Sequence, residues 1–479
     1  MRCTTTTTVS YISVARPSDS ALHRARYSRF DDVLVVSHEK DGHSNVIKAP
    51  SSLLTDRYEL SMLEGALASG VIDAKATFEV FTRSLANGYR YGVLGGTGRL
   101  LNELESFRFD EPTIAWLVAN HIVGSSLASY LADYQFGGDV FGYLEGEVFT
   151  AHSPVLRIEG RFADIVLETL ALSILNYDSG VATKAMRIVH AAGGRRLIEM
   201  GSRRTNEDAA VAAARAAYVA GFDATSNLAA GLLYDVPTAG TAAHAFILAH
   251  ASERDAFEAQ VAVQGPATTL LVDTFDTEAG TLLALEVAGN ELGAIRIDSG
   301  DMVNSSQRSR KLLDERGATN VKITLTGDLD EFAIAELLAR DAAVDTFGVG
   351  TKLVTGFTPP GFVFKLVAIE DGHVMRPVAK RSIGKLSTGG AKNAYRLTSN
   401  GVATTELVLV RSVDDERTRG SRLLTHHLVR SGTTLIDCSA EVARRHAASA
   451  IAELPDDAFT LTDDTPVLDT ELVTGERDD

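Results

Sequence analysis

Between Arg195 and Gly350 the sequence repeats one arrangement: a short apolar run rich in β-branched residues, a polar or glycine-containing end, and a segment with helical periodicity. The apolar runs lie near residues 196–204, 221–227, 236–244, 270–274, 294–301, 322–328 and 346–351. Such alternation is typical of βα units with parallel strands, so it predicts an α/β fold built on an irregular (β/α) barrel. The active site of such a barrel lies at the C-terminal ends of its strands, where residues far apart in sequence share one pocket.

The segments before and after this region complete the predicted domain organisation. We expect residues 51–160 to form the N-terminal part of an α/β domain, residues 161–365 the barrel, and residues 366–450 a C-terminal part that packs back on the first. A helix should begin near Thr55 and Asp56 and end at Gly70. Residues 1–50 are expected to be a disordered or over-extended N-terminus, and residues 451–479 an acidic, solvated tail.

Composition excludes several classes of protein. The chain of 479 residues carries 46 Lys and Arg against 63 Asp and Glu, a formal net charge of −17, so a nucleic-acid backbone would be repelled. Cys3 and Cys438 are too few and too far apart for a disulfide framework, which fits a reducing compartment. No uninterrupted apolar run reaches the roughly 18–20 residues that cross a bilayer. We therefore expect a cytoplasmic protein with neither nucleic acid nor membrane as a partner.

A pair of arginines gives the first candidate for a ligand contact. Arg203 and Arg204 follow a predicted strand and precede a predicted helix that Asn206 caps. Guanidinium groups and the free N–H groups of a helix N-terminus suit phosphate or pyrophosphate. From the motif alone, a solvated surface pair is an equally good interpretation.

Two acidic residues follow another predicted strand. Asp298 and Asp301 enclose a Ser-Gly turn in RIDSGD, where their carboxylates could hold ribose hydroxyls or a hydrated Mg²⁺. The same four letters also make an ordinary turn, so this motif alone does not decide between the two.

Glycines and a histidine complete the candidate pocket. Gly327 with Asp328, and Gly348 and Gly350 with Thr351, follow the last two predicted strands, where many barrels bind phosphate through backbone N–H groups. His244 follows Thr241 at another strand end and could act as a nucleophile or base, although most histidines are structural. The chain has no GxxxxGK[ST] motif, so ATP would have to bind in another way. Together these residues predict a pocket for a phosphorylated ribose.

A set of motifs in fixed order extends this interpretation. The motifs are TDRYELSM, ATFEVFTRSL, LETLALSILN, VATKAMRIV, EMGSRR, GFDATSNLAAG, GTAAHAF, RIDSGD, GDLDE and GVGTKLVTG. Over about residues 51–450 the chain thereby resembles the nicotinate phosphoribosyltransferases. The resemblance implies a type II phosphoribosyltransferase, in which N- and C-terminal segments form a split α/β domain beside an irregular barrel. Such enzymes join nicotinate to 5-phosphoribosyl 1-diphosphate (PRPP), with ATP hydrolysis, and release nicotinate mononucleotide and pyrophosphate for NAD salvage.

The same resemblance implies roles for individual residues. His244 would be transiently phosphorylated by ATP, with Arg296 and Asp298 beside it as further catalytic residues. The nicotinate site would be formed by Tyr58, Thr241, Arg296 and Ser226. The PRPP site would be formed by Arg203, Gly327, Asp328, Gly348, Gly350 and Thr351. The carboxylates of Asp298 and Asp301 would face ribose or Mg²⁺, with Asp273 as a weaker candidate. In the family that it resembles, the contact made by Tyr58 crosses a dimer interface, so the resemblance implies a homodimer with shared active sites.

Some positions depart from the family pattern, and alternatives remain. The loop after the arginines reads TNEDAA where relatives often have His and Gly-Pro, and AHAF replaces AHEW. Ser226 stands where nicotinamide phosphoribosyltransferases carry an aspartate, which favours nicotinate over nicotinamide as the substrate. The alternatives are a nicotinamide phosphoribosyltransferase, a quinolinate phosphoribosyltransferase and a catalytically silent sensor of NAD precursors.

Overall fold

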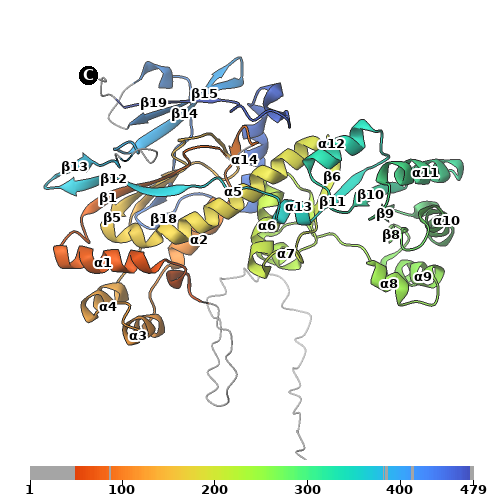
Figure 1. Ribbon diagram of the computed structural model, residues 1–479, viewed down its shortest axis with the longest axis horizontal. Coiled ribbons are helices and arrows are strands. Elements are labelled where there is room, and N and C mark those ends of the chain that lie inside the picture. The colour runs from red at the N-terminus through yellow and green to blue at the C-terminus, as the bar shows by residue number, and fades with distance from the viewer. Residues whose placement is uncertain (1–48, 86–87, 381, 383–386, 411–414, 475–479) are drawn as a thin grey trace, which may run out of the picture. The chain divides into compact units, whose positions relative to one another are not determined.

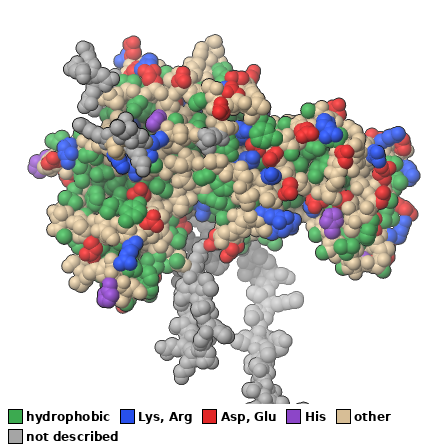
Figure 2. Space-filling model, viewed as in Figure 1, with side chains coloured by type: hydrophobic (Ala, Val, Ile, Leu, Met, Phe, Trp, Pro, Cys, Tyr) green, Lys and Arg blue, Asp and Glu red, His purple; other side chains and the backbone are tan. Residues whose placement is uncertain are grey.

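Two large β-sheets of different kinds organise the fold, and the long helix α5 (Glu168–Ala191) precedes the first strand of the parallel one in sequence (Figure 1). The computed structural model describes residues 49–85, 88–380, 382, 387–410 and 415–474. Of the expected N-terminal segment 1–50, all but the last two residues lie outside these ranges. On the face shown in Figure 2, acidic and basic side chains are interspersed.

The parallel sheet forms a curled half-barrel of six strands. Their order is β7 (Ala224–Thr225), β6 (Arg196–Glu199), β11 (Thr346–Val349), β10 (Lys322–Thr326), β9 (Ala294–Ile297) and β8 (Thr269–Leu271). Each neighbouring pair is parallel, with Thr326 opposite Gly348 and Thr324 opposite Arg296. Buried side chains such as Ile295, Leu325 and Phe347 fill its core. Parallel strands covered on both faces need such apolar runs, which is why these strands are recognisable in the sequence.

The strand expected at 236–244 is not formed, which is a correction to the seven-stranded prediction. Only one parallel bridge, between Thr225 and Thr238, extends the sheet there within residues 195–351, all of which the structure describes. Thr225 donates its N–H to Pro237, and Ala239 donates to Thr225. Pro237 has no N–H to give to a ladder, and Gly240 weakens an extended segment, so pairing ends after one residue.

Helices connect the parallel strands, and their ends follow local signals. They are α6 (Glu207–Val219), α7 (Leu228–Tyr234), α8 (His244–Leu248), α9 (Glu253–Gln264), α10 (Thr277–Ala288), α11 (Met302–Glu315), α12 (Glu331–Ala339) and α13 (Thr351–Val354). Asn206 caps α6 as expected, since its side chain accepts from the N–H groups of Asp208 and Ala209. Asp301 and Asp330 cap α11 and α12 in the same way. These caps fix where each loop at the pocket ends.

The second large sheet combines strands from both ends of the chain. Its order is β13 (Val374–Pro377), β12 (Val363–Asp371), β1 (Lys75–Phe81), β5 (Leu156–Arg161), β3 (Asp139–Gly142), β17 (His426–Arg430) and β18 (Thr433–Thr434). Strand β12 follows the half-barrel in sequence, yet it pairs antiparallel with β1.

Two smaller sheets complete the described strands. A four-stranded sheet contains β16 (Arg422–Leu423), β14 (Lys392–Ser399), β15 (Val402–Val410) and β19 (Asp469–Val473), and β2 (Gly92–Val93) pairs with β4 (Val148–Phe149).

Four helices belong to the N-terminal region that supplies β1, β3 and β5 to the seven-stranded sheet. They are α1 (Arg57–Ser69), α2 (Thr97–Ser106), α3 (Glu111–Ala119) and α4 (Ser125–Ala132). The predicted helix end at Gly70 is confirmed: this glycine has a φ of 77°, a left-handed conformation that closes α1. Tyr58 therefore lies in the first turn of α1, as expected.

The prediction that no stretch of the chain is long and apolar enough to cross a membrane needs a correction at helix α5. Together with the preceding 3₁₀ helix (Phe162–Leu167) it gives a stretch, Phe162–Ala191, that is long and apolar enough to cross a membrane by length and composition. This stretch is not an uninterrupted apolar run, because charged residues such as Asp164 and Glu168 stand among its apolar residues. In its most apolar window 67% of the residues are buried inside the fold, and core helices pass the same test. One such helix is weak evidence for a membrane span.

The expected solvated tail is also wrong for most of its length. After α14 (Ala440–Ala452) the chain forms a 3₁₀ helix, Asp456–Phe459, and then β19, which pairs parallel with β15. Leu454, Ala458 and Leu468 are buried. Apolar residues spaced among the acidic ones supply this core contact, while Asp457 and Asp463 pair with the buried Arg90.

Candidate active site

A pocket opens where four strands of the half-barrel end. It has a volume of about 70 Å³ and is lined by Met200, Arg203, Arg204, Arg296, Asp298, Thr326, Gly327, Asp328, Gly348, Gly350 and Thr351. These residues lie at or just after the C-terminal ends of β6, β9, β10 and β11, four strands that are adjacent in the sheet. The structure thus brings together residues that the sequence predicted separately, because parallel strands in register end at the same edge.

The pocket floor requires glycine at three positions. A Cβ atom on Gly327 would lie 2.4 Å from the carbonyl oxygen of Asp298, and one on Gly350 would lie 2.8 Å from that of Met200. On Gly348 it would meet the methyl group of Thr326 at 2.5 Å. Gly327 also has a φ of 116°, and Asp328 follows in a left-handed conformation with a φ of 47°. The loops therefore approach one another more closely than side chains would allow.

Arg296 and Asp298 form a hydrogen-bonded group at one wall. Arg296 donates to Asp298 Oδ1 over 2.6 Å, to Thr326 Oγ1 over 2.9 Å and to Thr241 Oγ1 over 2.9 Å. Burial alone would raise the pKa of Asp298, but hydrogen bonds from Thr326 and Arg296 outweigh it and lower that pKa below its ordinary value. Asp298 is thus an anion at neutral pH, and the guanidinium is held in one orientation with further N–H donors available.

His244 stands beside this group at the start of α8. Its Nδ1 lies 3.1 Å from Thr274 Oγ1, which fixes the ring. Its Nε2 faces two carboxylates, at 3.9 Å from Asp273 Oδ1 and 3.8 Å from Asp298 Oδ2. The side chain is 38% exposed, so a ligand can reach it. The arrangement suits an imidazole that must exchange a proton or a phosphoryl group.

Asp273, the weaker candidate from the sequence, is placed at the centre of this arrangement. Its side chain is buried. One oxygen, Oδ2, accepts from the Asp298 N–H at 2.9 Å and from Ser299 Oγ at 2.7 Å. The other, Oδ1, has no hydrogen-bond partner among the described residues and is the oxygen that faces His244. An unpaired buried oxygen is costly and points to a functional contact.

The predicted residues outside the pocket lining fall into two groups. Thr241, His244 and Asp273 contact its lining residues Arg296 or Asp298, and Tyr58, Ser226 and Asp301 form the second group. Tyr58 is 46% exposed on α1, where burial and the neighbouring Glu168 raise its pKa. Ser226 is exposed at the end of β7, with its N–H donating to the Glu199 carbonyl oxygen at 2.8 Å. Asp301 caps α11 and lines a neighbouring groove, which shares Gly327 and Asp328 with the pocket.

One residue that was not predicted from the sequence connects two loops of the site. The buried Glu199 ends β6; its carboxylate accepts from the Gly201 N–H and from Thr225 Oγ1. Burial raises its pKa. It therefore joins the loop of Arg203 to the loop of Ser226. A glutamate at the end of an otherwise apolar strand, RLIEM, is the signal that could have identified it.

The residues present provide few ligands for a resident metal ion. In the described part of the chain, no group of three or more His, Cys, Asp or Glu residues is arranged to hold one. Both oxygens of Asp301 are engaged by Asn304, at 3.1 Å and 2.6 Å. Asp298 Oδ1 already accepts from Arg296 and Thr326, which leaves Oδ2. Such a set fits only a Mg²⁺ that takes most of its ligands from water and substrate phosphates.

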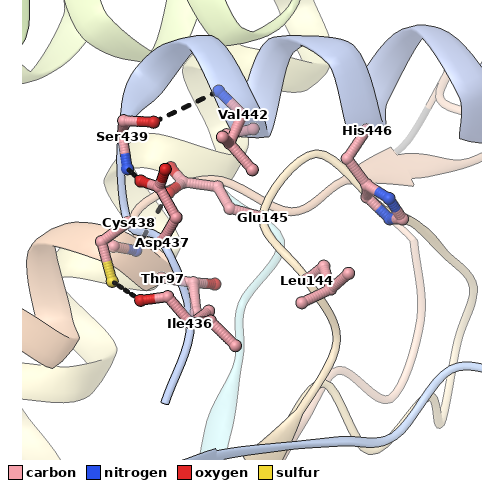
Figure 3. A pocket seen from close by; sticks show the side chains of 11 residues that line it. Thr97, Leu144, Glu145, Ile436, Asp437, Cys438, Ser439, Val442 and His446 are labelled. Carbon is pink, nitrogen blue, oxygen red and sulfur yellow. Dashed lines mark hydrogen bonds between the residues drawn. The ribbon is translucent and has the colours of Figure 1, made fainter. Parts of the chain in front are cut away.

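A second pocket, between α2 and α14, has a different character (Figure 3). Its buried Glu145 accepts from the Gly96 and Gly98 N–H groups and pairs with Arg215. The pocket also contains Cys438, whose pKa burial raises to about 11. The thiol is therefore protonated at neutral pH and is a poor nucleophile.

The half-barrel and the arginine-lined pocket at its strand ends define an α/β protein whose site lies at the C-terminal edge of a parallel sheet. Family models match two parts of the chain: the nicotinate phosphoribosyltransferase (NAPRTase) N-terminal domain matches residues 53–176, and the nicotinate phosphoribosyltransferase (NAPRTase) family matches residues 195–407. The chain belongs to the nicotinate phosphoribosyltransferase family.

Individual relatives agree with this assignment. A nicotinate phosphoribosyltransferase of Mycobacterium tuberculosis is 49% identical over 436 residues, which cover 88% of this chain and 96% of that protein. One of Bacillus subtilis is 36% identical, with 79% of each chain covered.

Two solved structures share the fold. Nicotinate-nucleotide pyrophosphorylase from Pyrococcus furiosus has a TM-score of 0.70 and 26% identity over 86% of this chain and 99% of its own. Human nicotinic acid phosphoribosyltransferase has a TM-score of 0.75 and 23% identity over 88% of this chain and 97% of its own.

Proposed function

We propose that this protein is an ATP-dependent nicotinate phosphoribosyltransferase of NAD salvage, which joins nicotinate and PRPP to nicotinate mononucleotide and pyrophosphate. The observation that carries the proposal is the single pocket in which Arg203, Arg296 and Asp298 meet two glycine-containing loops. Family membership and the names of the relatives support the same reaction.

The proposed transfer occurs at the anomeric carbon of PRPP. A bond forms between the pyridine nitrogen and C1 of the ribose, while the bond from C1 to the diphosphate oxygen breaks and the oxygen keeps the electron pair. Positive charge develops on the ribose, which the ionised Asp298 would stabilise. Arg203 and the N–H groups around Gly327 and Gly350 would hold the phosphates in place.

His244 would couple this reaction to ATP. With Nδ1–H donated to Thr274, Nε2 holds the free electron pair that attacks the γ-phosphorus of ATP. An N–P bond forms, the bond to the bridging oxygen breaks, and ADP leaves with that electron pair. Water later hydrolyses the phosphohistidine to phosphate. The neighbouring carboxylates of Asp273 and Asp298 would position the ring for this attack.

Mg²⁺ is proposed as a companion of the PRPP diphosphate. Asp298 Oδ2 is the carboxylate oxygen that would reach it, with Asp301 less suited because Asn304 occupies both of its oxygens. When bound, such an ion would neutralise charge on the leaving diphosphate.

Nicotinate is the proposed pyridine. Its carboxylate would meet the oriented guanidinium of Arg296 beside Thr241. Ser226 would donate a hydrogen bond without adding the negative charge that an aspartate would bring. Tyr58 would complete the site from the partner subunit of a homodimer, since its exposed ring on α1 can meet another copy. We place the enzyme in the cytoplasm.

The domain organisation belongs to the same proposal. Strands β1, β3 and β5 share a sheet with β12 and β17, which supports one α/β domain split between N- and C-terminal segments. Its boundaries would be 51–160 and 366–450, on either side of a barrel domain at 161–365.

One assay tests the proposal. Mononucleotide formation should be measured from nicotinate and from nicotinamide, each with PRPP and Mg²⁺, with and without ATP. We expect product from nicotinate, stimulated by ATP. Equal or greater turnover of nicotinamide would support the alternative phosphoribosyltransferase, and no turnover of either would support the silent sensor.

A further inference from the structure

A buried cluster of charges lies behind the pocket, outside its lining. Glu331, the first residue of α12, is 1% exposed. Its carboxylate pairs with two cations of α5: Arg187, whose Nε lies 3.0 Å from Oε1, and Lys184, whose ammonium pairs with Oε2. All three side chains are at least nine-tenths buried.

The cluster fixes one end of a loop that lines the pocket. Only four residues, Gly327 to Asp330, connect β10 to α12. Their backbone is already restricted, since Gly327 and Asp328 both have positive φ and Asp330 caps α12. With β10 fixed at one end, the position of Asp328 depends on where Glu331 holds the first turn of α12.

Helix α5 serves as the common support. It packs against α12 and also against α13, the short helix that begins at Thr351 after the second glycine-containing loop (Figure 1). Arg187 also donates to the Gly88 carbonyl oxygen at 3.0 Å and lies 5.1 Å from the ring of Tyr89. Arg187, one of the two cations that hold Glu331, is therefore itself held by another part of the chain.

Stability alone does not account for such a cluster. Burying three charges requires removing each of them from water, which costs free energy. Apolar residues of similar size at these positions often stabilise a fold equally well. The advantage of two cations on one carboxylate is a single, well-defined geometry. A fixed geometry matters most when a residue that contacts a ligand lies only a few positions away in the sequence, as Asp328 does from Glu331.

We propose that Glu331 is a positioning residue for PRPP, which acts through the Gly327–Asp330 loop by its pairing with Lys184 and Arg187. This inference rests on the proposed function. It predicts a defect in PRPP binding rather than in nicotinate binding, because the loop lines the phosphate side of the pocket, whereas Arg296 and Thr241 form the wall proposed for nicotinate.

The first experiment compares Glu331→Gln with Glu315→Gln. Glutamine keeps the shape of Glu331 but removes its charge, so two buried cations repel and α12 shifts. We expect the KM for PRPP to rise about tenfold, while kcat at saturating PRPP and the KM for nicotinate change by less than about twofold. Glu315 lies on α11 in an exposed pair with Lys311, so its variant should match the wild type.

A second variant distinguishes weaker PRPP binding from misfolding. Lys184→Met keeps the Arg187 pair and should raise the KM for PRPP in the same direction by a smaller factor, and the double variant should be non-additive. Calorimetric titration with PRPP should show the same weakening without turnover, so it is independent of the nicotinate assay. Equal rises in both KM values, or lower thermal stability with unchanged PRPP affinity, would overturn the inference. An inactive wild type that still binds PRPP more tightly than Glu331→Gln would contradict only the proposed function.

Discussion

Nε2 of His244 lies 3.9 Å from Oδ1 of Asp273, an oxygen without a hydrogen-bond partner in the described part of the chain. This distance is too long for a hydrogen bond in the free protein, and catalytic contacts of this kind commonly shorten when a ligand binds. We infer that Asp273 controls the orientation of the imidazole, although the sequence alone ranked it below Asp298.

This relationship predicts the behaviour of Asp273→Asn. The amide keeps the contact to the Asp298 N–H but removes the negative charge beside His244, so phosphorylation by ATP should slow by about a hundredfold or more. Phosphohistidine formed from γ-labelled ATP and the rate of nucleotide formation with and without ATP give the measurement. His244→Ala should lose the label and the ATP stimulation completely while remaining folded. ATP stimulation that persists unchanged in either variant would contradict the proposed coupling.

Ser226 is predicted to determine which pyridine is used. In Ser226→Asp a second carboxylate would face that of nicotinate, and a like-charge contact in a partly desolvated site costs several kcal/mol. We expect the ratio of kcat/KM for nicotinate over nicotinamide to fall by at least about tenfold. Ser226→Ala is the matched control, because it removes the hydroxyl without adding charge and should change the ratio much less. If wild type already used both pyridines equally, this role of Ser226 would be wrong.

Tyr58 is predicted to act in the site of a partner subunit. Neither Tyr58→Ala nor His244→Ala homodimers should show ATP-stimulated activity, but mixed dimers would hold one site with both native residues and should recover up to about a quarter to a half of the wild-type ATP-stimulated activity. Activity after co-expression with two different affinity tags measures this. Absence of recovery in purified mixed dimers would show that each chain forms its own site.

Asp178 should make stability depend on pH. It is fully buried on α5, its Oδ1 pairs with Arg99 at 2.7 Å, and its Oδ2 has no hydrogen-bond partner among the described residues. Burial raises its pKa to about 6, against the ordinary value of 3.8, although Arg99 opposes the rise. Because the folded pKa is the higher one, its stabilisation is complete below pH 3.8 and is lost as the pH rises through 6.

Asp178→Asn removes this dependence, since the amide imitates the protonated acid. The free energy of unfolding of the variant relative to wild type should increase by about 2 kcal/mol between pH 4 and pH 7. Urea unfolding at several pH values measures it, with Asp314→Asn, an exposed residue on α11, as the control. A difference that stays constant over this range would show that Asp178 does not titrate there.

The sequence by itself determined the features that depend on local pattern. Buried parallel strands require apolar, β-branched runs, and their C-terminal ends must converge, so the positions of Arg203, Asp298, Asp328 and Gly350 along the chain were enough to assign them to one pocket. Helix ends at Gly70 and Asn206 followed from conformational and hydrogen-bonding preferences of single residues.

Only the tertiary structure decided what depends on long-range contacts. The segment 236–244 could extend the sheet by one bridge only, and the acidic segment after 452 found a strand partner in β15. The unpaired oxygen of Asp273 and the buried pairing of Glu331 with α5 arise from residues that are distant in sequence. Their charges look like solvated surface groups in the sequence, because the letters of a chain do not record which carboxylate will be removed from water or which cation will meet it there.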